Sequence, residues 1–256
     1  MNFDFNTSEY DLFEGMTSIS SVIDSIVNGT SDRKIIKVLY NDEKRKSKYN
    51  ELKFLEHKSN ELGFLLEGVS HTCIDGIAQG KTHGGIIAVC SKRTVHTLKP
   101  SDIRKDGFYA ILEGIEDPYN FGYAVRSLYA SGASGIIIPD DRFSSARGLI
   151  CKASAGTSEL VEMYVCDSPG TADMFRQKKY KIVCAGIRDS VSLYDADLKK
   201  PVLLIIGGEK RGISRSVLEK SDITVRIEYG KTFKGSLPAS SAATVLAFEV
   251  YRQNRD

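Results

Sequence analysis

The feature that most constrains the fold of this chain is a regular alternation of short apolar strands and helical segments beginning at Phe108. Helical segments fit between most of the strands, and residues 238–252 predict a final helix. This alternation is typical of a mostly parallel sheet covered by helices on both faces, whose ligands bind in loops at the carboxyl ends of the strands. The expected strands are residues 108–112, 134–138, 161–165, 181–187, 202–207 and 223–227.

The chain before Phe108 has a less regular pattern. Its first 30 residues are expected to begin irregularly and then form a helix, because Ile19, Val22, Ile23 and Ile26 recur at helical spacing before Asn28-Gly29. Further elements are expected as strands at 35–39 and 86–90 and as a helix at 51–62.

The polar segment 91–106 contains Pro100 and ends at Gly107, which is typical of a linker. A chain of 256 residues is long enough for two modest domains. The patterns therefore predict a smaller α/β domain over residues 1–95, a linker over 96–106 and a larger α/β domain over 107–256.

Composition excludes several classes of protein. Hydrophobic residues make up 41% and charged residues 27% of the chain, and the net charge of +2 is too small for a global basic field. The first residues lack a signal peptide, and no apolar run is long enough to cross a bilayer, so we expect a cytoplasmic protein without a membrane partner. Five cysteines without a C-x-x-C pair and four scattered histidines predict buried reduced thiols and no metal.

The most distinctive stretch is residues 112–126, which leaves an expected strand, turns at Asp117-Pro118 and opens a helix near Asn120. Asn120 is a natural helix cap there. Gly122 and Arg126 are four residues apart and so share one helix face, where the missing side chain of glycine would allow a ligand or backbone to approach. Arg126 could equally form a surface salt bridge.

Two later stretches also place glycines and charges directly after strands. Residues 203–214 run from an apolar strand into Gly207-Gly208-Glu209 and a further glycine, and such a loop can bring its backbone against a flat ligand. Residues 227–243 form a basic glycine-containing loop and then a helix start rich in small residues, with Pro238 suited to its first turn.

These glycines do not form the usual phosphate loops. Residues 207–214 have the glycine spacing of a Walker A loop, but Ile213 stands where its lysine belongs. No G-x-G-x-x-G follows a strand either, so the sequence supports neither a P-loop site nor a Rossmann dinucleotide site.

In order and spacing, the three stretches together resemble the signature motifs of the SpoU (TrmH-like) family of SPOUT methyltransferases. The resemblance covers about residues 105–252, and residues 152–157 also look like a family segment. The matching positions are Asn120, Gly122 and Arg126 in the first motif, Gly208, Glu209 and Gly212 in the second, and Ser236, Leu237, Ser240 and Ala242 in the third.

The resemblance implies a trefoil-knotted α/β domain that binds S-adenosylmethionine and methylates a ribose 2′-hydroxyl of RNA, as a homodimer whose two subunits form the active site. Residues 1–95 resemble, more faintly, the L30e-like RNA-binding domain of this family. The residues implied for catalysis are Asn120, Arg126, Glu209 and Ser236. Those implied for the cofactor are Gly186, Ile206, Gly207, Gly208, Gly212, Ile227, Ser236, Leu237 and Ser240.

The chemistry of arginine limits the role of Arg126. Arginine stays protonated in proteins, so we expect it to contact the target hydroxyl or phosphate and to stabilise developing negative charge instead of acting as a base. Asn120 is expected to orient Arg126 or the ribose, and Glu209 to pair with Arg126 or with a base of the partner subunit.

The substrate remains open at this level. Two domains favour ribosomal RNA over transfer RNA by analogy with the family. A basic run, Lys44, Arg45, Lys46 and Lys48, is a candidate RNA contact, although Asp42 and Glu43 beside it also suit a solvated loop.

Pro238 is a departure from the family pattern, because the third motif usually has Asn at that position. Proline offers neither a side-chain amide nor a backbone N–H. This keeps open an RNA-binding protein of the same fold that has lost turnover. Some other nucleotide-dependent α/β enzyme is the third alternative.

Overall fold

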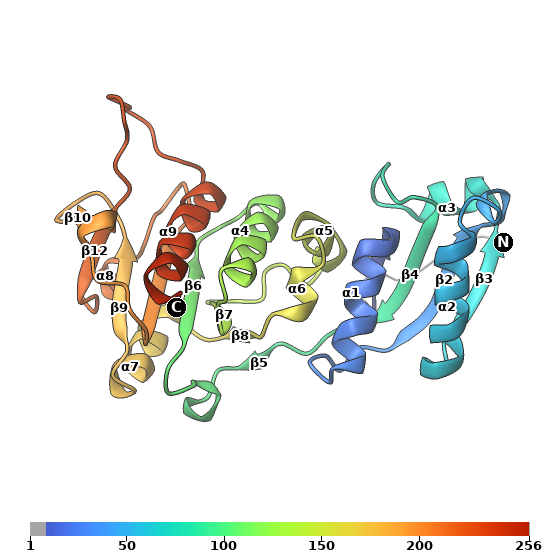
Figure 1. Ribbon diagram of the computed structural model, residues 1–256, viewed down its shortest axis with the longest axis horizontal. Helices are drawn as coiled ribbons and strands as arrows, with labels where there is room; N and C mark the ends of the chain where they lie inside the picture. Colours follow the sequence, from blue (N-terminus) through green and yellow to red (C-terminus); the bar gives the residue numbers. More distant parts are fainter. Residues whose placement is uncertain (1–8, 256) are drawn as a thin grey trace. The chain divides into compact units, whose positions relative to one another are not determined.

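The computed structural model describes residues 9–255 of the chain, which form two compact units (Figure 1). The first unit runs to Thr94 and also includes Phe143–Leu160. The second comprises Val95–Arg142 and the chain from Val161 onward. The break at Thr94 lies close to the expected boundary, but Phe143–Leu160 was expected within the larger domain and packs instead with the first unit.

The first unit contains a four-stranded mixed sheet in the order β1-β4-β2-β3. Its strand β4 is antiparallel to both β1 and β2, whereas β2 and β3 are parallel. The strands are β1 (Tyr10–Glu14), β2 (Ile35–Asn41), β3 (Leu65–Val69) and β4 (Ile86–Ser91), and the helices are α1 (Gly15–Val27), α2 (Tyr49–Leu62), α3 (His71–Ile77), α5 (Arg147–Ala153) and α6 (Thr157–Leu160).

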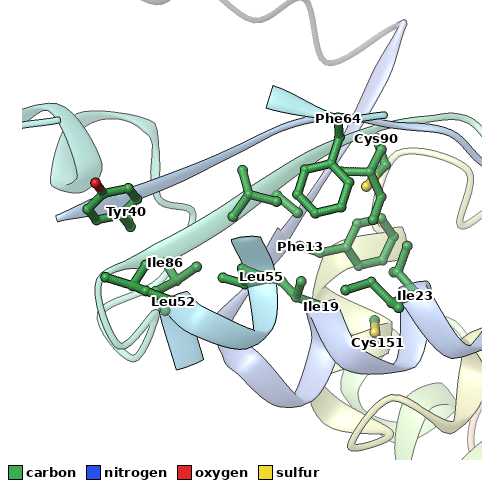
Figure 2. Close-up of a cluster of buried hydrophobic side chains, with 14 residues drawn as sticks. Phe13, Ile19, Ile23, Tyr40, Leu52, Leu55, Phe64, Ile86, Cys90 and Cys151 are labelled. Carbon is green, nitrogen blue, oxygen red and sulfur yellow. The ribbon is translucent and has the colours of Figure 1, made fainter. Parts of the chain in front are cut away.

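Alternating side chains of this sheet build two apolar clusters. Phe13 lies in the larger cluster with α1, α2 and Cys151 of α5 (Figure 2). Its neighbour Leu12 lies in a smaller cluster with Ile74 of α3. This alternation follows from the two-residue period of a strand. The structure contains the expected helix over residues 19–26 and both expected strands, as α1, β2 and β4. The sequence did not predict β1, β3 or α3. Residues 1–8, expected to be irregular, lie outside the described part.

A buried ion-pair network ties the segment Phe143–Leu160 to the rest of the first unit. The guanidinium of Arg33 donates to Asp11 Oδ2 at 2.6 Å and to Glu159 Oε2 at 2.7 Å, and all three side chains are buried. Burial alone would disfavour the charged guanidinium, but attraction to Glu159 and Asp11 outweighs it and raises the pKa of Arg33.

The backbone of this segment also approaches the unit closely. A Cβ on Gly148 would lie 1.9 Å from the carbonyl oxygen of Leu12, and one on Gly156 would lie 1.8 Å from Ser21 Oγ. Gly156 in addition has a φ of +91°, a backbone angle that residues with a side chain rarely adopt. Only glycine therefore allows α5 and α6 to pack this tightly on β1 and α1.

The second unit contains an eight-stranded sheet in which every pair of neighbouring strands is parallel, in the order β10-β12-β9-β11-β6-β7-β8-β5. The prediction of a mostly parallel sheet with intervening helices is confirmed. The strands are β5 (His96–Thr97), β6 (Phe108–Glu113), β7 (Gly135–Ile138), β8 (Met163–Val165), β9 (Lys181–Ala185), β10 (Val191–Ser192), β11 (Val202–Gly207) and β12 (Ile223–Arg226), and the helices are α4 (Pro118–Ala130), α7 (Ser168–Gln177), α8 (Arg215–Leu218) and α9 (Ala239–Asn254).

The segment expected as a linker is part of this unit. Residues 96–97 form β5 at the edge of the sheet beside β8, and a short 3₁₀ turn follows at Pro100–Asp102. Leu98 and Ile103 are buried in the core cluster that contains Tyr109 and Phe175. In the described part of the chain, no helix has the length and apolar character needed to span a membrane.

Candidate active site

Three loops of the second unit meet around one cavity of about 1060 Å³. They follow β9, β11 and β12, which are neighbours in the sheet, so each leaves the same edge at the carboxyl end of its strand. The start of α9 closes a further side. Apolar side chains contribute much of the lining, namely Ile206, Ile213, Val225, Leu237 and Leu246.

Glycines allow the backbone of the loop after β11 to turn tightly at the cavity wall. A Cβ on Gly207 would lie 2.4 Å from the carbonyl carbon of Gly212, and one on Gly208 would lie 1.9 Å from the carbonyl oxygen of Gly114. Gly212 has a φ of +63° and donates its N–H to the Gly208 carbonyl at 3.0 Å. The glycines at 207 and 208 are thus required by close contacts between backbone segments.

A hydrogen-bonded group joins the three sequence motifs beside the cavity. Glu209 Oε1 accepts from Asn120 Nδ2 at 3.2 Å and from the backbone N–H of Ala239 at 3.0 Å. Ser240 Oγ donates to Asn120 Oδ1 at 3.2 Å. Asn120 belongs to α4, Glu209 to the loop after β11, and Ala239 and Ser240 to α9, so these contacts fix three distant parts of the chain relative to one another.

The start of α9 explains how the chain accommodates Pro238. Pro238 occupies the N-cap position and makes no side-chain capping hydrogen bond. The carboxylate of Glu209 instead accepts from the first helical N–H, that of Ala239. A negative charge is favourable at this end of a helix, so Glu209 supplies the cap that the local sequence lacks.

Asn120 does not cap α4, contrary to our expectation. The N-cap is Asp117, whose Oδ1 accepts from the backbone N–H of Asn120 at 2.7 Å, and Pro118 occupies the first turn. Because Asp117 performs this role, the side-chain amide of Asn120 is available to Glu209 and Ser240.

Arg126 lies apart from the cavity on the exposed side of α4. Within residues 9–255 Arg126 forms no ion pair, so the expected pairing of Glu209 with Arg126 is wrong within one chain. The expected orientation of Arg126 by Asn120 is also wrong within one chain, because the side chain of Asn120 bonds to Glu209 instead. Tyr119 and Tyr123 share this face at spacings of three and four residues, and each is 48% exposed.

Most of the other residues proposed for the site line the cavity. They are Gly186, Ile206, Gly207, Gly208, Glu209, Gly212, Ile227, Ser236 and Leu237. Ser240 is the exception, since it is buried beside the cavity and bonds to Asn120.

The basic run lies in the first unit. Lys44, Arg45 and Lys46 are exposed, Lys48 is half-buried, and Lys48 pairs with Glu51 at 2.8 Å. Arg45 lies 3.8 Å from Asp42, so nearby acids engage two of the four bases.

Sequence reasoning missed several residues of the cavity wall. Arg188 and Arg211 come from the loops after β9 and β11, and Tyr229, Lys231 and Phe233 from the loop after β12. The signal that could have found them is the presence of two aromatic residues among glycines and lysines in residues 229–235.

The nearby chain offers little for covalent or metal chemistry. Burial raises the pKa of Cys184, in β9, to about 12, so its thiol stays protonated at neutral pH. All five cysteines are free, with Cys90, Cys151 and Cys184 buried as expected and the other two half-buried. Among residues 9–255, no three histidine, cysteine or acidic side chains are grouped to hold a metal ion.

Solved structures share this fold. The SpoU methyltransferase AviRb from Streptomyces viridochromogenes, in complex with the cofactor AdoMet, superposes with a TM-score of 0.77 at 21% identity, covering 96% of this chain and 91% of that one. An AdoMet-bound rRNA methyltransferase from Sinorhizobium meliloti gives a TM-score of 0.75 at 22% identity, covering 96% of this chain and 88% of that one.

Sequence relatives show the family. A Staphylococcus saprophyticus protein named for the TrmH family of tRNA/rRNA methyltransferases is 31% identical over 241 residues, 91% of this chain and 93% of the relative. The 23S rRNA (guanosine-2'-O-)-methyltransferase RlmB of Shewanella oneidensis is 30% identical over 206 residues, 78% of this chain and 83% of the relative. Residues 107–248, more than half of the chain, match the model of the SpoU rRNA Methylase family. The chain therefore belongs to this family of RNA methyltransferases.

Proposed function

We propose that this protein transfers a methyl group from S-adenosylmethionine to a ribose 2′-hydroxyl of ribosomal RNA, and that it does so in the cytoplasm. The observation that carries the proposal is the Asn120–Glu209–Ser240 group, which joins all three motifs at the wall of one cavity. RlmB relatives, named for a guanosine 2′-O-methyl transfer in 23S rRNA, favour ribosomal over transfer RNA.

The cavity suits the proposed methyl donor. Its volume of about 1060 Å³ is slightly above the roughly 300–1,000 Å³ typical of small-molecule sites, and apolar side chains can enclose an adenine ring. The backbone carbonyl of Gly186 and the exposed Ser236 hydroxyl can bond to its polar parts. S-adenosylmethionine would supply a methyl group already activated by its sulfonium.

The residues of the chain would then position the acceptor. We assign Asn120 and Glu209 to holding the loops in register, and Arg126 to the phosphate or hydroxyl of the target nucleotide. A guanidinium stabilises negative charge that develops on the ribose oxygen, while the proton passes to phosphate or water.

We further propose that Arg126 acts in the cavity of a second copy of the chain. Arg126 does not line its own cavity, and it lies on an exposed face with Tyr119 and Tyr123. Helix α9 packs beside α4 and adds Phe248 and Tyr251, which are 43% and 47% exposed. Exposed aromatic residues gathered on two adjacent helices favour a protein interface.

Two finer features belong to the same proposal. A trefoil knot is the first, as the family resemblance implies, and the close approach of residue 208 to residue 114 supports it by bringing the loop after β11 against the loop after β6. The separate mixed sheet of the first unit, with exposed Lys44 and Lys46, supports an L30e-like domain that contacts RNA phosphates.

The test measures transfer of tritiated methyl groups to ribosomal RNA from cells lacking the gene, followed by mapping of 2′-O-methyl positions. Wild-type protein should modify one or a few riboses. Arg126→Ala should lower the single-turnover rate by about 100-fold or more, the range for losing one charge-stabilising donor, without changing the affinity for S-adenosylhomocysteine.

Lys178→Ala removes a positive charge at the end of α7, away from the cavity, and should leave the rate unchanged. Full activity of Arg126→Ala would contradict the assignment of this residue. If the wild-type protein binds RNA but incorporates no label into any RNA, the protein is a binder that has lost turnover, the alternative that Pro238 keeps open.

A further inference from the structure

The loop between β12 and α9 carries two aromatic residues that the core does not require. Figure 1 shows this loop extending away from the sheet between the two elements. Residues 228–236 are all exposed, and among them Tyr229 and Phe233 are 38% and 56% exposed. Exposed rings on a loop that lines a binding cavity indicate a contact with a ligand or partner.

The two rings are held in place by the loop itself. Their centroids are 5.4 Å apart at an interplanar angle of 72°, an edge-to-face arrangement. The hydroxyl of Tyr229 accepts from the backbone N–H of Leu237 at 3.2 Å. The ring of Phe233 lies so close to Gly235 that a Cβ there would approach Cζ to 2.7 Å. The exposed face of Phe233 is therefore preorganised.

The charges beside the rings identify the kind of ligand. Lys231 and Lys234 flank Phe233, Arg188 lines the same cavity, and none of the three forms an ion pair with another residue in the range 9–255. Unpaired positive charges attract phosphate. Exposed rings beside such charges suit a nucleic acid, whose bases stack and whose backbone is anionic.

We propose that Phe233, supported by Tyr229, stacks against an unpaired base of the RNA substrate, and that Lys231 and Lys234 contact the phosphates on either side of that base. This inference rests on the proposed function and adds a substrate-positioning element to it. Stacking between an aromatic ring and a base tolerates any base, so the loop would hold an unpaired nucleotide at the cavity mouth without reading its identity.

The test uses the full chain and a short single-stranded oligoribonucleotide containing 2-aminopurine, whose fluorescence falls when it stacks. Wild-type protein should quench the probe, and Phe233→Ala should weaken its binding by roughly 5- to 100-fold with loss of quenching. Phe233→Trp should restore both. The double variant Lys231→Gln/Lys234→Gln should lower the slope of log affinity against log salt by about 1.4.

Affinity for S-adenosylhomocysteine, measured by calorimetry, separates the two ligands and should be the same in all these variants. Tyr194→Ala removes an equally exposed ring that does not line the cavity, and it should change neither affinity. A loss of S-adenosylhomocysteine affinity in Phe233→Ala would assign the ring to the cofactor, and unchanged probe binding would assign it no role in RNA binding. Either result overturns the inference. The proposed function fails separately, if wild-type protein neither binds S-adenosylhomocysteine nor methylates RNA.

Discussion

Glu209 connects the loop after β11 to both other motifs through a single carboxylate oxygen. That oxygen accepts from the side chain of Asn120 and from the backbone of Ala239. The second contact lies at the positive end of the α9 dipole, where a carboxylate stabilises the first turn. The side chain is exposed, so its contribution to stability is modest, and its main effect is to fix the positions of the groups around it.

We predict that Glu209→Ala destabilises the first turn of α9 by about 1 kcal/mol, the usual cost of losing a helix cap. Amide hydrogen exchange of residues 239–242 should accelerate, while that of the last turn of α9 should not. Glu209→Gln keeps an acceptor oxygen and should show a smaller effect. Glu219→Ala removes an acid from an exposed ion pair on Arg215 and serves as control. Unchanged exchange at Ala239 in Glu209→Ala would refute the capping role.

Several site residues could be placed from sequence because their positions depend on local order along the chain. A strand that ends in Gly207-Gly208 must enter a loop, and parallel neighbours bring such loops to one edge. The role of Asn120 could not be placed this way. Its partners lie 89 and 120 residues away, and both Asp117 and Asn120 are good helix caps, so only the fold decides between them.

Among the secondary-structure elements, β11 can be predicted from its local sequence, whereas β1 depends on partners that are distant in the chain. Strand β11 is apolar almost throughout and buried, so its sequence alone predicts it. Strand β1 contains Asp11 and Glu14, which are buried but paired with bases from elsewhere in the first unit. Because those partners are distant in sequence, the local pattern around these acids does not reveal a buried strand.

Phe143–Leu160 shows the same dependence on distant partners. Its Glu159 shares Arg33 with Asp11 in a site closed to solvent. We predict that Arg33→Met costs the first unit about 3–5 kcal/mol, because the buried carboxylate of Glu159 loses its guanidinium partner and that of Asp11 keeps only Lys92. The loss of unfolding free energy can be measured by urea denaturation, with amide hydrogen exchange in α1 and β2 reporting on the first unit.

Lys58→Met is the matched control, because it breaks a pair with the exposed Glu61 and should destabilise the unit far less than Arg33→Met. If the two substitutions destabilise the unit equally, the Arg33 network does not hold the segment in place.

At the level of the whole molecule, the proposed active site is formed by two chains. Symmetric pairing places the same face of both chains against each other. If α4 and α9 form that face, Arg126 of each chain serves the cavity of the other.

Complementation tests this arrangement. Arg126→Ala and the cavity-blocking Ser236→Trp should each be inactive alone. Mixed dimers, co-expressed with two different tags and purified through both, should recover about half of wild-type activity, because one of their two sites pairs an intact cavity with an intact Arg126. Recovery of no activity in mixed dimers, or recovery of no mixed dimers, would contradict a shared site.

The division of the first unit into two stretches of chain also matters while the protein is being made. Domains at the start of a nascent chain usually fold before later ones emerge. Here Arg33 leaves the ribosome long before Glu159, and β6, α4 and β7 are translated between them. The buried network around Arg33 therefore cannot be completed until part of the second unit has already been synthesised.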